Sequence, residues 1–158
     1  MTVDQIHEAV DARAARLAAR HRERLVCRSG CFDCCVDDVT VFEIEAEKIR
    51  NGAAELLANG TPHAAGRCAF LGEAGECRVY ALRPYVCRTQ GLPLRWIDDD
   101  AEAEYRDICA LNEEGEAIES LAAEDCWTLG ETEEQLARLQ LASTGDLRRV
   151  RLRDLFRG

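Results

Sequence analysis

The sequence predicts a mostly helical α+β fold, a small irregular domain in which short β-hairpins are flanked by helices. Apolar residues recur at helical spacing near both ends of the chain. In the middle, short β-like runs surround turns, and most of the nine cysteines lie among them. A length of 158 residues suits a single domain, so we expect one domain over residues 1–158, with a cysteine-rich core at about 27–109 and helical flanks.

The first helix is expected to run from the N-terminus to about Leu25. Thr2 and Gln5 have the spacing of a capping box at its start. An apolar stripe follows at helical spacing, formed by Ile6, Val10, Ala14, Leu17 and His21. A histidine on such a stripe is either a ligand or a half-buried side chain with satisfied hydrogen bonds, and we favour the second for His21.

Beyond the first cysteines the chain is expected to be extended and then helical. Residues 36–41 are rich in valine and favour an extended segment. A helix is expected over residues 43–50, with Asn51-Gly52 as its stop, and a second helical piece over residues 53–58. The helices before and after the cysteine-rich core are expected to pack around it and exclude solvent.

Two hairpins are expected in the middle of the chain. In the first, residues 67–71 and 76–80 flank a glycine-bounded turn, which would bring Cys68 and Cys77 together. A short helical turn opened by Pro84 would then place Cys87 beside this hairpin.

The second hairpin pairs residues 91–97 with residues 103–106. Its turn contains Asp98, Asp99 and Asp100. Three consecutive aspartates can bind Ca²⁺, but the alternating ligands and downstream glutamate of an EF-hand are missing, so we expect a solvated turn.

The C-terminal part is expected to be helical again. One helix is expected from Glu113 to near residue 126. Thr132 and Gln135 have the spacing of a second capping box, for a helix that ends at residues 143–145. In the arginine-rich tail, residues 146–158, the apolar side chains are expected to close the core while the arginines face water.

Charge and hydropathy exclude several classes of partner. A net charge of −10 and a pI near 4.8 argue against nucleic acid, because binding phosphates needs a basic face. The N-terminus has no signal-peptide hydrophobic region, and no apolar stretch approaches the roughly 18 residues that would span a membrane. We therefore expect a cytoplasmic protein, in which nine reduced cysteines indicate metal ligation or redox chemistry more than disulfides.

The most informative segment is the loop that contains Cys27, Cys31, Cys34 and Cys35. Four thiols in a C-x3-C-x2-C-C spacing supply soft ligands that suit Zn²⁺ and iron–sulfur clusters. The first three also match the cysteine spacing of radical S-adenosylmethionine enzymes, but the chain is too short for the barrel of those enzymes. Adjacent side chains of an extended backbone point in opposite directions. Either Cys34 or Cys35 should therefore face the core, or the pair should bridge two centres.

The later cysteines extend this loop into a larger ligand set. Four thiolates complete one tetrahedral zinc site or one cubane cluster, so eight would suffice for two such sites. Cys126, next to Trp127, is expected to be a buried structural cysteine. Five arginines near the cysteines would either offset the negative charge of the thiolates or only reflect the arginine-rich composition: Arg28, Arg67, Arg78, Arg83 and Arg88. The predicted metal ligands are Cys27, Cys31, Cys34, Cys35, Cys68, Cys77, Cys87 and Cys109.

These motifs, in this order, resemble the YkgJ-type CxxCxxCC cysteine-cluster family of zinc- or iron-chelating domain proteins. The resemblance rests on residues 27–35, Cys68-Ala-Phe-Leu, Cys77-Arg-Val-Tyr and Arg83-Pro84-x2-Cys87-Arg88, and it extends to about Cys109. It implies roughly eight metal-binding cysteines, which correspond to the eight named above. A similar cluster accompanies flagellin lysine methylases, which implies iron–sulfur chemistry in at least one branch.

Three functions are compatible with these residues. We favour a metal-binding protein that holds zinc or an iron–sulfur cluster for storage, sensing or electron relay. The first alternative is an enzyme whose cluster supports redox or methyl-transfer chemistry on a protein partner, although no catalytic constellation stands out. The second is a thiol–disulfide oxidoreductase that uses Cys34-Cys35 or Cys31-x2-Cys34 as its dithiol, without the expected βαβ setting. The residues do not identify catalytic groups.

Overall fold

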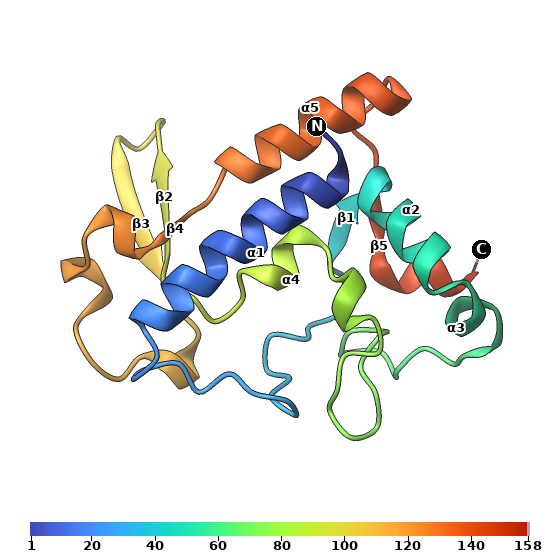
Figure 1. Cartoon of the computed structure of the whole chain (residues 1–158), viewed down its shortest axis with the longest axis horizontal. Coiled ribbons are helices and arrows are strands. Elements are labelled where there is room, and N and C mark those ends of the chain that lie inside the picture. The colour runs from blue at the N-terminus through green and yellow to red at the C-terminus, as the bar shows by residue number, and fades with distance from the viewer. Residues whose placement is uncertain (158) are drawn as a thin grey trace.

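A computed structural model describes residues 1–157 and confirms a mostly helical α+β fold (Figure 1). The longer helices and the strands are α1 (Val3–Arg20), β1 (Thr40–Phe42), α2 (Glu43–Gly52), α3 (Ala54–Asn59), α4 (Tyr85–Arg88), β2 (Leu94–Asp98), β3 (Ala103–Asp107), β4 (Trp127–Thr128), α5 (Glu131–Thr144) and β5 (Arg149–Arg151). Short 3-10 turns cover Tyr80–Leu82, Ala110–Asn112, Ile118–Ser120, Ala123–Asp125 and Leu152–Arg157. Across residues 1–157, no helix combines the length and apolarity needed to cross a bilayer.

Helix α1 begins as predicted and ends earlier than predicted. The capping box is present, because the Thr2 N–H donates to Gln5 Oε1 at 2.8 Å and the Gln5 N–H donates to Thr2 Oγ1 at 3.2 Å. The helix ends at Arg20, and a single turn continues the chain to Leu25. His21 is buried and its Nε2 lies 2.7 Å from the carbonyl oxygen of Asp125, so it is a histidine with a satisfied hydrogen bond, as favoured above.

Two hydrophobic clusters hold the elements together. In the first, α1 packs beside α5 (Figure 1) and onto α4, and Trp127 and Leu136 are almost fully buried between them. In the second, α2, β1 and the C-terminal tail enclose Phe70, whose ring centroid lies 5.0 Å from that of Phe156. Cys68 and Cys77 pack against this second cluster, so the cysteine-rich segment rests directly on the core.

Two small sheets link distant parts of the chain. Strand β5 pairs antiparallel with β1, which joins the tail to the segment after the cysteine loop. Leu152 and Leu155 are buried beyond β5, as predicted for the tail. The other sheet has the order β3-β2-β4, and its β2–β3 hairpin confirms the predicted second hairpin. At the tip, Asp98 Oδ1 accepts hydrogen bonds from the N–H groups of residues 100 and 101, so the aspartate side chain caps its own turn.

The helix predicted from Glu113 to near residue 126 was wrong. This segment contains two 3-10 turns separated by extended residues, and Gly115 has a φ of +116°. Arginine side chains from elsewhere bind its carbonyl groups: Arg106 Nη1 donates to the carbonyls of Ile118 and Leu121 at 3.0 and 2.6 Å. The carbonyls are therefore satisfied without a helix.

The predicted capping box at the start of α5 was also wrong. Thr132 lies inside the helix, and Gly130 precedes the first helical residue without a side-chain cap. The predicted stop is confirmed, because Gly145 adopts the left-handed conformation that ends α5.

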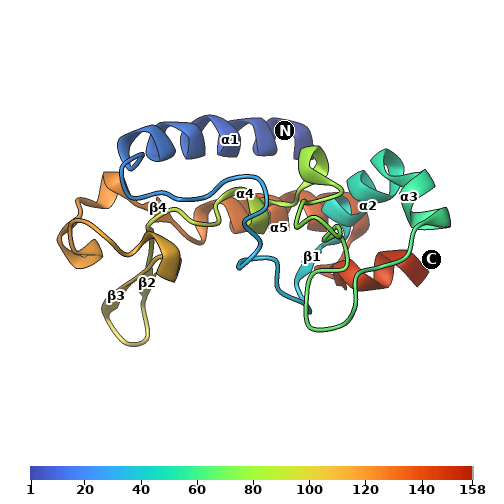
Figure 2. The same ribbon diagram turned by 90° about the horizontal axis from the view of Figure 1, so that it is seen from below.

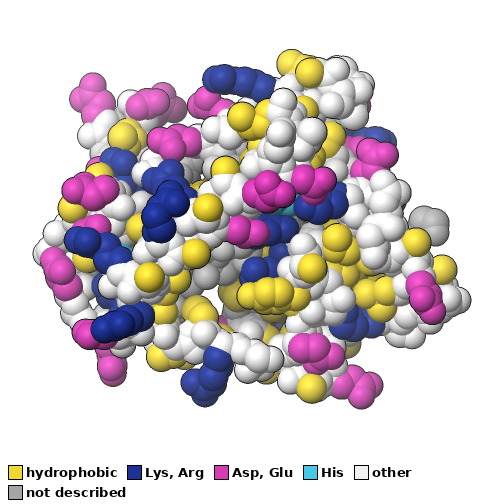
Figure 3. All heavy atoms as spheres, viewed as in Figure 1, with side chains coloured by type: hydrophobic (Ala, Val, Ile, Leu, Met, Phe, Trp, Pro, Cys, Tyr) yellow, Lys and Arg dark blue, Asp and Glu magenta, His cyan; other side chains and the backbone are white. Residues whose placement is uncertain are grey.

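On the face of the molecule shown in Figure 3, acidic and basic side chains are interspersed.

Arg153 in the tail connects both flanks of the cysteine region. Its Nε donates to Asp37 Oδ1 at 2.9 Å, and its Nη atoms donate to the carbonyls of His63 and Arg67, both at 2.7 Å. The Arg153 guanidinium and the Gly66 N–H lower the pKa of Asp37 to about 2. A depressed folded-state pKa gives stability that is present above the ordinary aspartate pKa, about 4, and is lost as the pH falls through the folded value.

Asp37→Asn is therefore expected to destabilise the protein at neutral pH, and the difference from wild type should shrink as the pH falls from about 4 to about 2. Denaturant titrations of chelator-treated samples would measure this without a contribution from bound metal. Asp99→Asn, at the exposed hairpin tip, is the control. A difference that stayed constant across this range would contradict the account.

Candidate metal centre

Seven of the eight cysteines predicted as ligands line one cavity of about 490 Å³. They come from three segments: the loop after α1, the hairpin around residue 72, and α4. Figures 1 and 2 show the loop after α1 running beside the green segment of the hairpin. The seven are Cys27, Cys31, Cys34, Cys35, Cys68, Cys77 and Cys87.

Two tight turns shape the cysteine loop. The Cys31 N–H donates to the Arg28 carbonyl at 2.9 Å, and Gly30 has a φ of +89°, which favours glycine at that position. The Cys35 N–H donates to the Phe32 carbonyl at 2.9 Å and closes the second turn. Consecutive turns bring all four cysteines of a short segment to the same cavity.

The vicinal pair departs from the expectation that its side chains point apart. Cys34 and Cys35 both line the cavity, and their thiols are hydrogen-bonded to each other. The expectation assumed an extended backbone, whereas Cys34 lies within a turn. The hydrogen bond from Cys35 lowers the pKa of Cys34 to about 6, and the same bond raises the pKa of Cys35.

The first hairpin places Cys68 and Cys77 in the cavity as predicted, with less strand structure than predicted. Its ladder is reduced to a single bridge between Leu71 and Cys77. The Gly72 N–H donates to the Glu76 carbonyl at 2.8 Å and closes the turn. The Cys68 N–H donates to the Cys35 carbonyl at 3.0 Å, so the hairpin and the cysteine loop are joined through their backbones.

Backbone amides stabilise the negative form of two of these thiols. The backbone N–H of Phe70 acts to lower the pKa of Cys68, and the backbone N–H of Val79 acts to lower that of Cys77. Burial nevertheless raises the pKa of both thiols. N–H groups aimed at sulfur are the contacts expected around thiolates that bind metal.

Helix α4 carries Cys87 into the cavity, beside the hairpin as predicted. Pro84 immediately precedes this helix, and the Cys87 N–H donates to its carbonyl at 3.0 Å. Burial, with the nearby charges of Cys68 and Cys77, raises the pKa of Cys87 to about 12. The start of α4 is fixed by Glu45 of α2, whose Oε1 accepts a hydrogen bond from the Tyr85 N–H at 2.7 Å.

Arginine side chains give the cavity a positive component. Arg28 and Arg83 line it. The Arg83 guanidinium lies 3.6 Å from the centre of the Tyr80 ring, and its charge lowers the pKa of Cys34 and Cys77. The positions of Arg28 and Arg83 therefore support a role in offsetting the negative charge of the thiolates.

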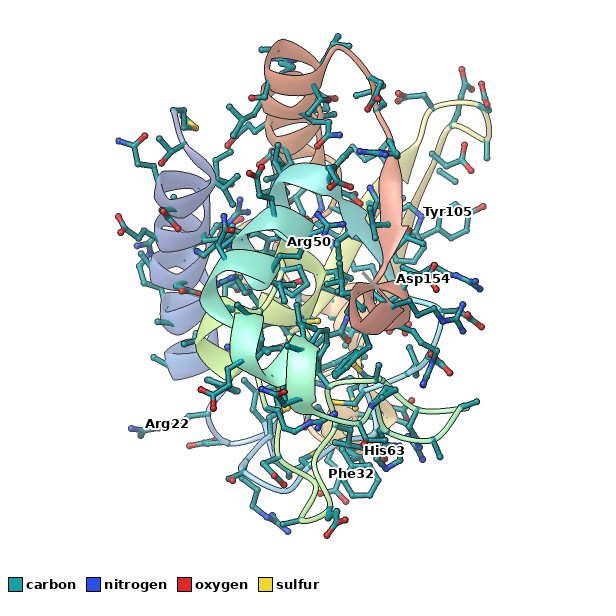
Figure 4. The ribbon with its side chains drawn as sticks, turned by 90° about the vertical axis from the view of Figure 1, so that its right-hand side faces the viewer. Arg22, Phe32, Arg50, His63, Tyr105 and Asp154 are labelled. Carbon is teal, nitrogen blue, oxygen red and sulfur yellow. The ribbon has the colours of Figure 1, made fainter. Side chains whose placement is uncertain are left out.

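The other three arginines have structural contacts. Arg78 donates to the Ala69 carbonyl at 2.6 Å, although its charge also acts on Cys77. Arg88 pairs with Asp11 of α1 at 2.5 Å, and Arg67 lies over the Phe32 ring at 5.3 Å. In Figure 4, Phe32 lies at the lower edge of the molecule, in the region of the cysteine loop. Tyr105 lies well above it in this view.

Two cysteines lie outside the lining of the cavity. Cys109 precedes the 3-10 turn Ala110–Asn112 and is half-buried. Its place as an eighth ligand stays a prediction. Cys126 is fully buried beside Trp127, and its sulfur lies 3.4 Å from Arg106 Nη1, which agrees with the structural role expected for it.

Sequence reasoning missed three residues around Cys27. Asn112 Nδ2 lies 3.4 Å from the Cys27 sulfur, Gly91 lies against the same sulfur, and Arg24 binds the backbone of the asparagine turn. A glycine with positive φ and a buried asparagine carry no pattern in a single sequence, because their partners lie tens of residues away. Within residues 1–157, no group of three or more Cys, His, Asp or Glu side chains is placed closely enough to hold a metal ion as the structure stands.

A protein-family model matches the cysteine-rich part of the chain. The model, CxxCxxCC, is described as a putative zinc- or iron-chelating domain and matches residues 26–110, more than half of the 158-residue chain. The matched region contains all eight cysteines that were predicted as ligands and excludes Cys126. No curated protein and no solved structure matches the chain.

Proposed function

Because this chain belongs to the CxxCxxCC family of zinc- or iron-chelating domains, we propose that its cysteine cavity holds a thiolate-bound metal centre. The observation that carries the proposal is that seven cysteines from three segments line one cavity. Thiolates are soft ligands that suit zinc and iron–sulfur clusters. The backbone N–H groups directed at Cys68 and Cys77 and the charge of Arg83 support the same assignment.

The number of donors exceeds what a single zinc ion or a single [4Fe–4S] cluster needs. One zinc ion or one [4Fe–4S] cluster takes about four thiolates. Seven thiols along one cavity exceed that number, and Cys109 would be an eighth from the adjoining segment. We therefore propose a polynuclear centre, made of zinc or of iron and sulfide. Cys34 and Cys35 are adjacent and both line the cavity, so they would lie between neighbouring metal ions.

A thiol–disulfide oxidoreductase is the second candidate, and the contact between the Cys34 and Cys35 thiols favours it. Adjacent Cα atoms are about 3.8 Å apart, shorter than the roughly 4.4–6.8 Å of ordinary disulfides. A disulfide within this pair would therefore be strained. The candidate also leaves the five other cavity thiols without a role.

The rest of the chain is proposed to form one domain with this centre. Helix α1 and the C-terminal tail lie outside the matched region, yet α1 packs on α4 and β5 pairs with β1. We also propose a cytoplasmic location, because thiolate ligands need reduced cysteines. Storage, sensing, electron relay and cluster-dependent modification of a protein partner are all compatible with such a centre.

Anaerobic purification followed by metal and sulfide analysis and a visible spectrum tests the proposal. Iron, inorganic sulfide and a brown colour would identify an iron–sulfur centre. Colourless protein with more than one zinc ion per chain would identify a zinc–thiolate centre. Folded protein that bound neither metal, and that cycled between dithiol and disulfide forms, would overturn the proposal in favour of the second candidate.

A further inference from the structure

The side chain of Asn112 contacts Cys27 and is fully buried. Its Nδ2 lies 3.4 Å from the Cys27 sulfur and donates to the Gly91 carbonyl at 2.8 Å. Its Oδ1 accepts a hydrogen bond from the Val26 N–H at 2.9 Å. Both N–H groups of the amide and one lone pair of its oxygen are therefore used. If the amide were rotated by 180°, its oxygen would face the sulfur and the Gly91 carbonyl, and its N–H groups would face the Val26 N–H.

Gly91 leaves room for the Cys27 sulfur. A Cβ atom at this position would lie 2.5 Å from the sulfur and 3.2 Å from Asn112 Nδ2. Gly91 also has a φ of +87°, which residues other than glycine rarely adopt. Cys27 is exposed and lines the cavity, and its sulfur lies against Gly91 and Asn112.

Arg24 fixes the backbone that carries the asparagine. It is buried, and its Nε donates to the Asn112 carbonyl at 3.0 Å. Its two Nη atoms donate to the carbonyls of Glu116 and Glu113 at 3.0 and 3.1 Å. Arg24 and Asn112 both lie outside residues 26–110, so the family match does not include this arrangement.

We propose that Asn112 is the positioning residue of Cys27: its carboxamide donates to the sulfur and orients it into the cavity as a metal ligand. This inference rests on the proposed function. An N–H···S contact from a fixed amide stabilises the thiolate and limits its rotation. Because the contact comes from outside the matched region, it makes retention of the first ligand depend on the segment after Cys109.

Asn112→Asp is the most direct variant. It keeps the acceptor for the Val26 N–H and replaces the donor by a second oxygen, which faces the Cys27 sulfur and the Gly91 carbonyl. Loss of such an outer contact lowers metal affinity by about 10–100-fold. Gln140→Glu is the matched control, because Gln140 is also fully buried and binds backbone groups, but of α2 and the tail.

A second variant crowds the sulfur without replacing the amide, and it has its own control. Gly91→Ala places a methyl group on the Cys27 sulfur at a positive φ. Gly145→Ala imposes a similar backbone conflict, with a φ of +78°, where a Cβ meets no atom within 4 Å. Gly91→Ala should therefore reproduce the effect of Asn112→Asp, and Gly145→Ala should not.

The experiment measures zinc or iron retention against a chelator, and the alkylation of each cysteine by peptide mass spectrometry. Cys27 is exposed, so its alkylation rate is compared with that in wild type. We expect weaker retention in Asn112→Asp and Gly91→Ala, with the alkylation of Cys27 accelerated more than that of the other cavity cysteines, and no change in either control. Wild-type retention and wild-type protection of Cys27 in Asn112→Asp would overturn the inference. Equal exposure of all seven cysteines in Asn112→Asp and Gln140→Glu would overturn it too, since that indicates general destabilisation.

Failure of the proposed metal binding can be distinguished from failure of the positioning role of Asn112. If the wild-type protein binds neither metal, the same alkylation is compared in metal-free wild type and Asn112→Asp. A changed rate for Cys27 alone would support the positioning role of Asn112, and an unchanged rate would overturn it.

Discussion

Replacing Cys31 by alanine is expected to release metal and to lower the stability of the metal-loaded protein to that of the metal-free protein. Cys31 lies in the middle of the cysteine loop, where its own N–H makes only a local turn bond with Arg28. Metal ligation would therefore be the main contact that orders this part of the loop. Bound metal stabilises a fold by about 4 kcal/mol when free metal is about 1,000-fold above the dissociation constant, and binding and ordering are coupled.

Chelation separates this effect from ordinary destabilisation. The difference in unfolding free energy between wild type and Cys31→Ala should disappear once both are metal-free. Cys126→Ala is the matched control: it removes a sulfur from the core, so its cost should persist after chelation while its metal content stays at the wild-type level. A Cys31→Ala protein with full metal content and wild-type stability would show that Cys31 is not a ligand.

Glu45→Ala is expected to cost about 3–5 kcal/mol of unfolding free energy, because it leaves buried partners unsatisfied. Glu45 is 3% exposed, and its Oε1 lies 2.9 Å from His7 Nε2 and 2.7 Å from the Tyr85 nitrogen. The other ring nitrogen of His7 lies 3.3 Å from Lys48 Nζ, so the histidine donates to Glu45 and accepts from the lysine. The carboxylate thus ties α1, α2 and the start of α4 together.

The effect should also reach the metal centre, since α4 carries Cys87. Urea titrations of Glu45→Ala would give the stability, and alkylation of Cys87 in the loaded protein would report loosening of α4. Glu47→Ala changes an exposed glutamate two residues away on the same helix and should be nearly neutral. Equal effects of the two substitutions would contradict the role given to Glu45.

The parts of the fold that sequence predicts well are those with local signals. The capping box of Thr2 and Gln5, the glycine at the end of α5 and the turn of the second hairpin all depend on residues close in sequence. The convergence of Cys68, Cys77 and Cys87 also follows from two neighbouring turns. By contrast, residues 113–126 have a helical apolar pattern, but Arg106 and Arg24 bind their carbonyls from distant segments and hold them out of a helix.

The cysteine cavity likewise has features that the sequence predicts and features that it does not. The spacing of the thiols is a property of the sequence, so seven of the cysteines that line the cavity could be predicted to lie together, whereas Cys109 lies outside its lining. The shared orientation of Cys34 and Cys35 could not, because it depends on a turn closed by the Phe32 carbonyl. Asn112 lies 85 positions from Cys27, and nothing near it in sequence marks it as a contact of that cysteine. Contacts around the ligands become visible only in three dimensions.

The central claim is that the thiols lining one cavity hold the metal. Metal-edge X-ray absorption of anaerobically purified protein measures the ligand atoms directly. We expect ligand atoms that are sulfur alone, at about 2.3 Å for zinc, with a second metal ion nearby, and loss of that signal in Cys31→Ala. Oxygen or nitrogen among the ligand atoms, or a full set of sulfur ligands that survives in Cys31→Ala, would contradict the claim.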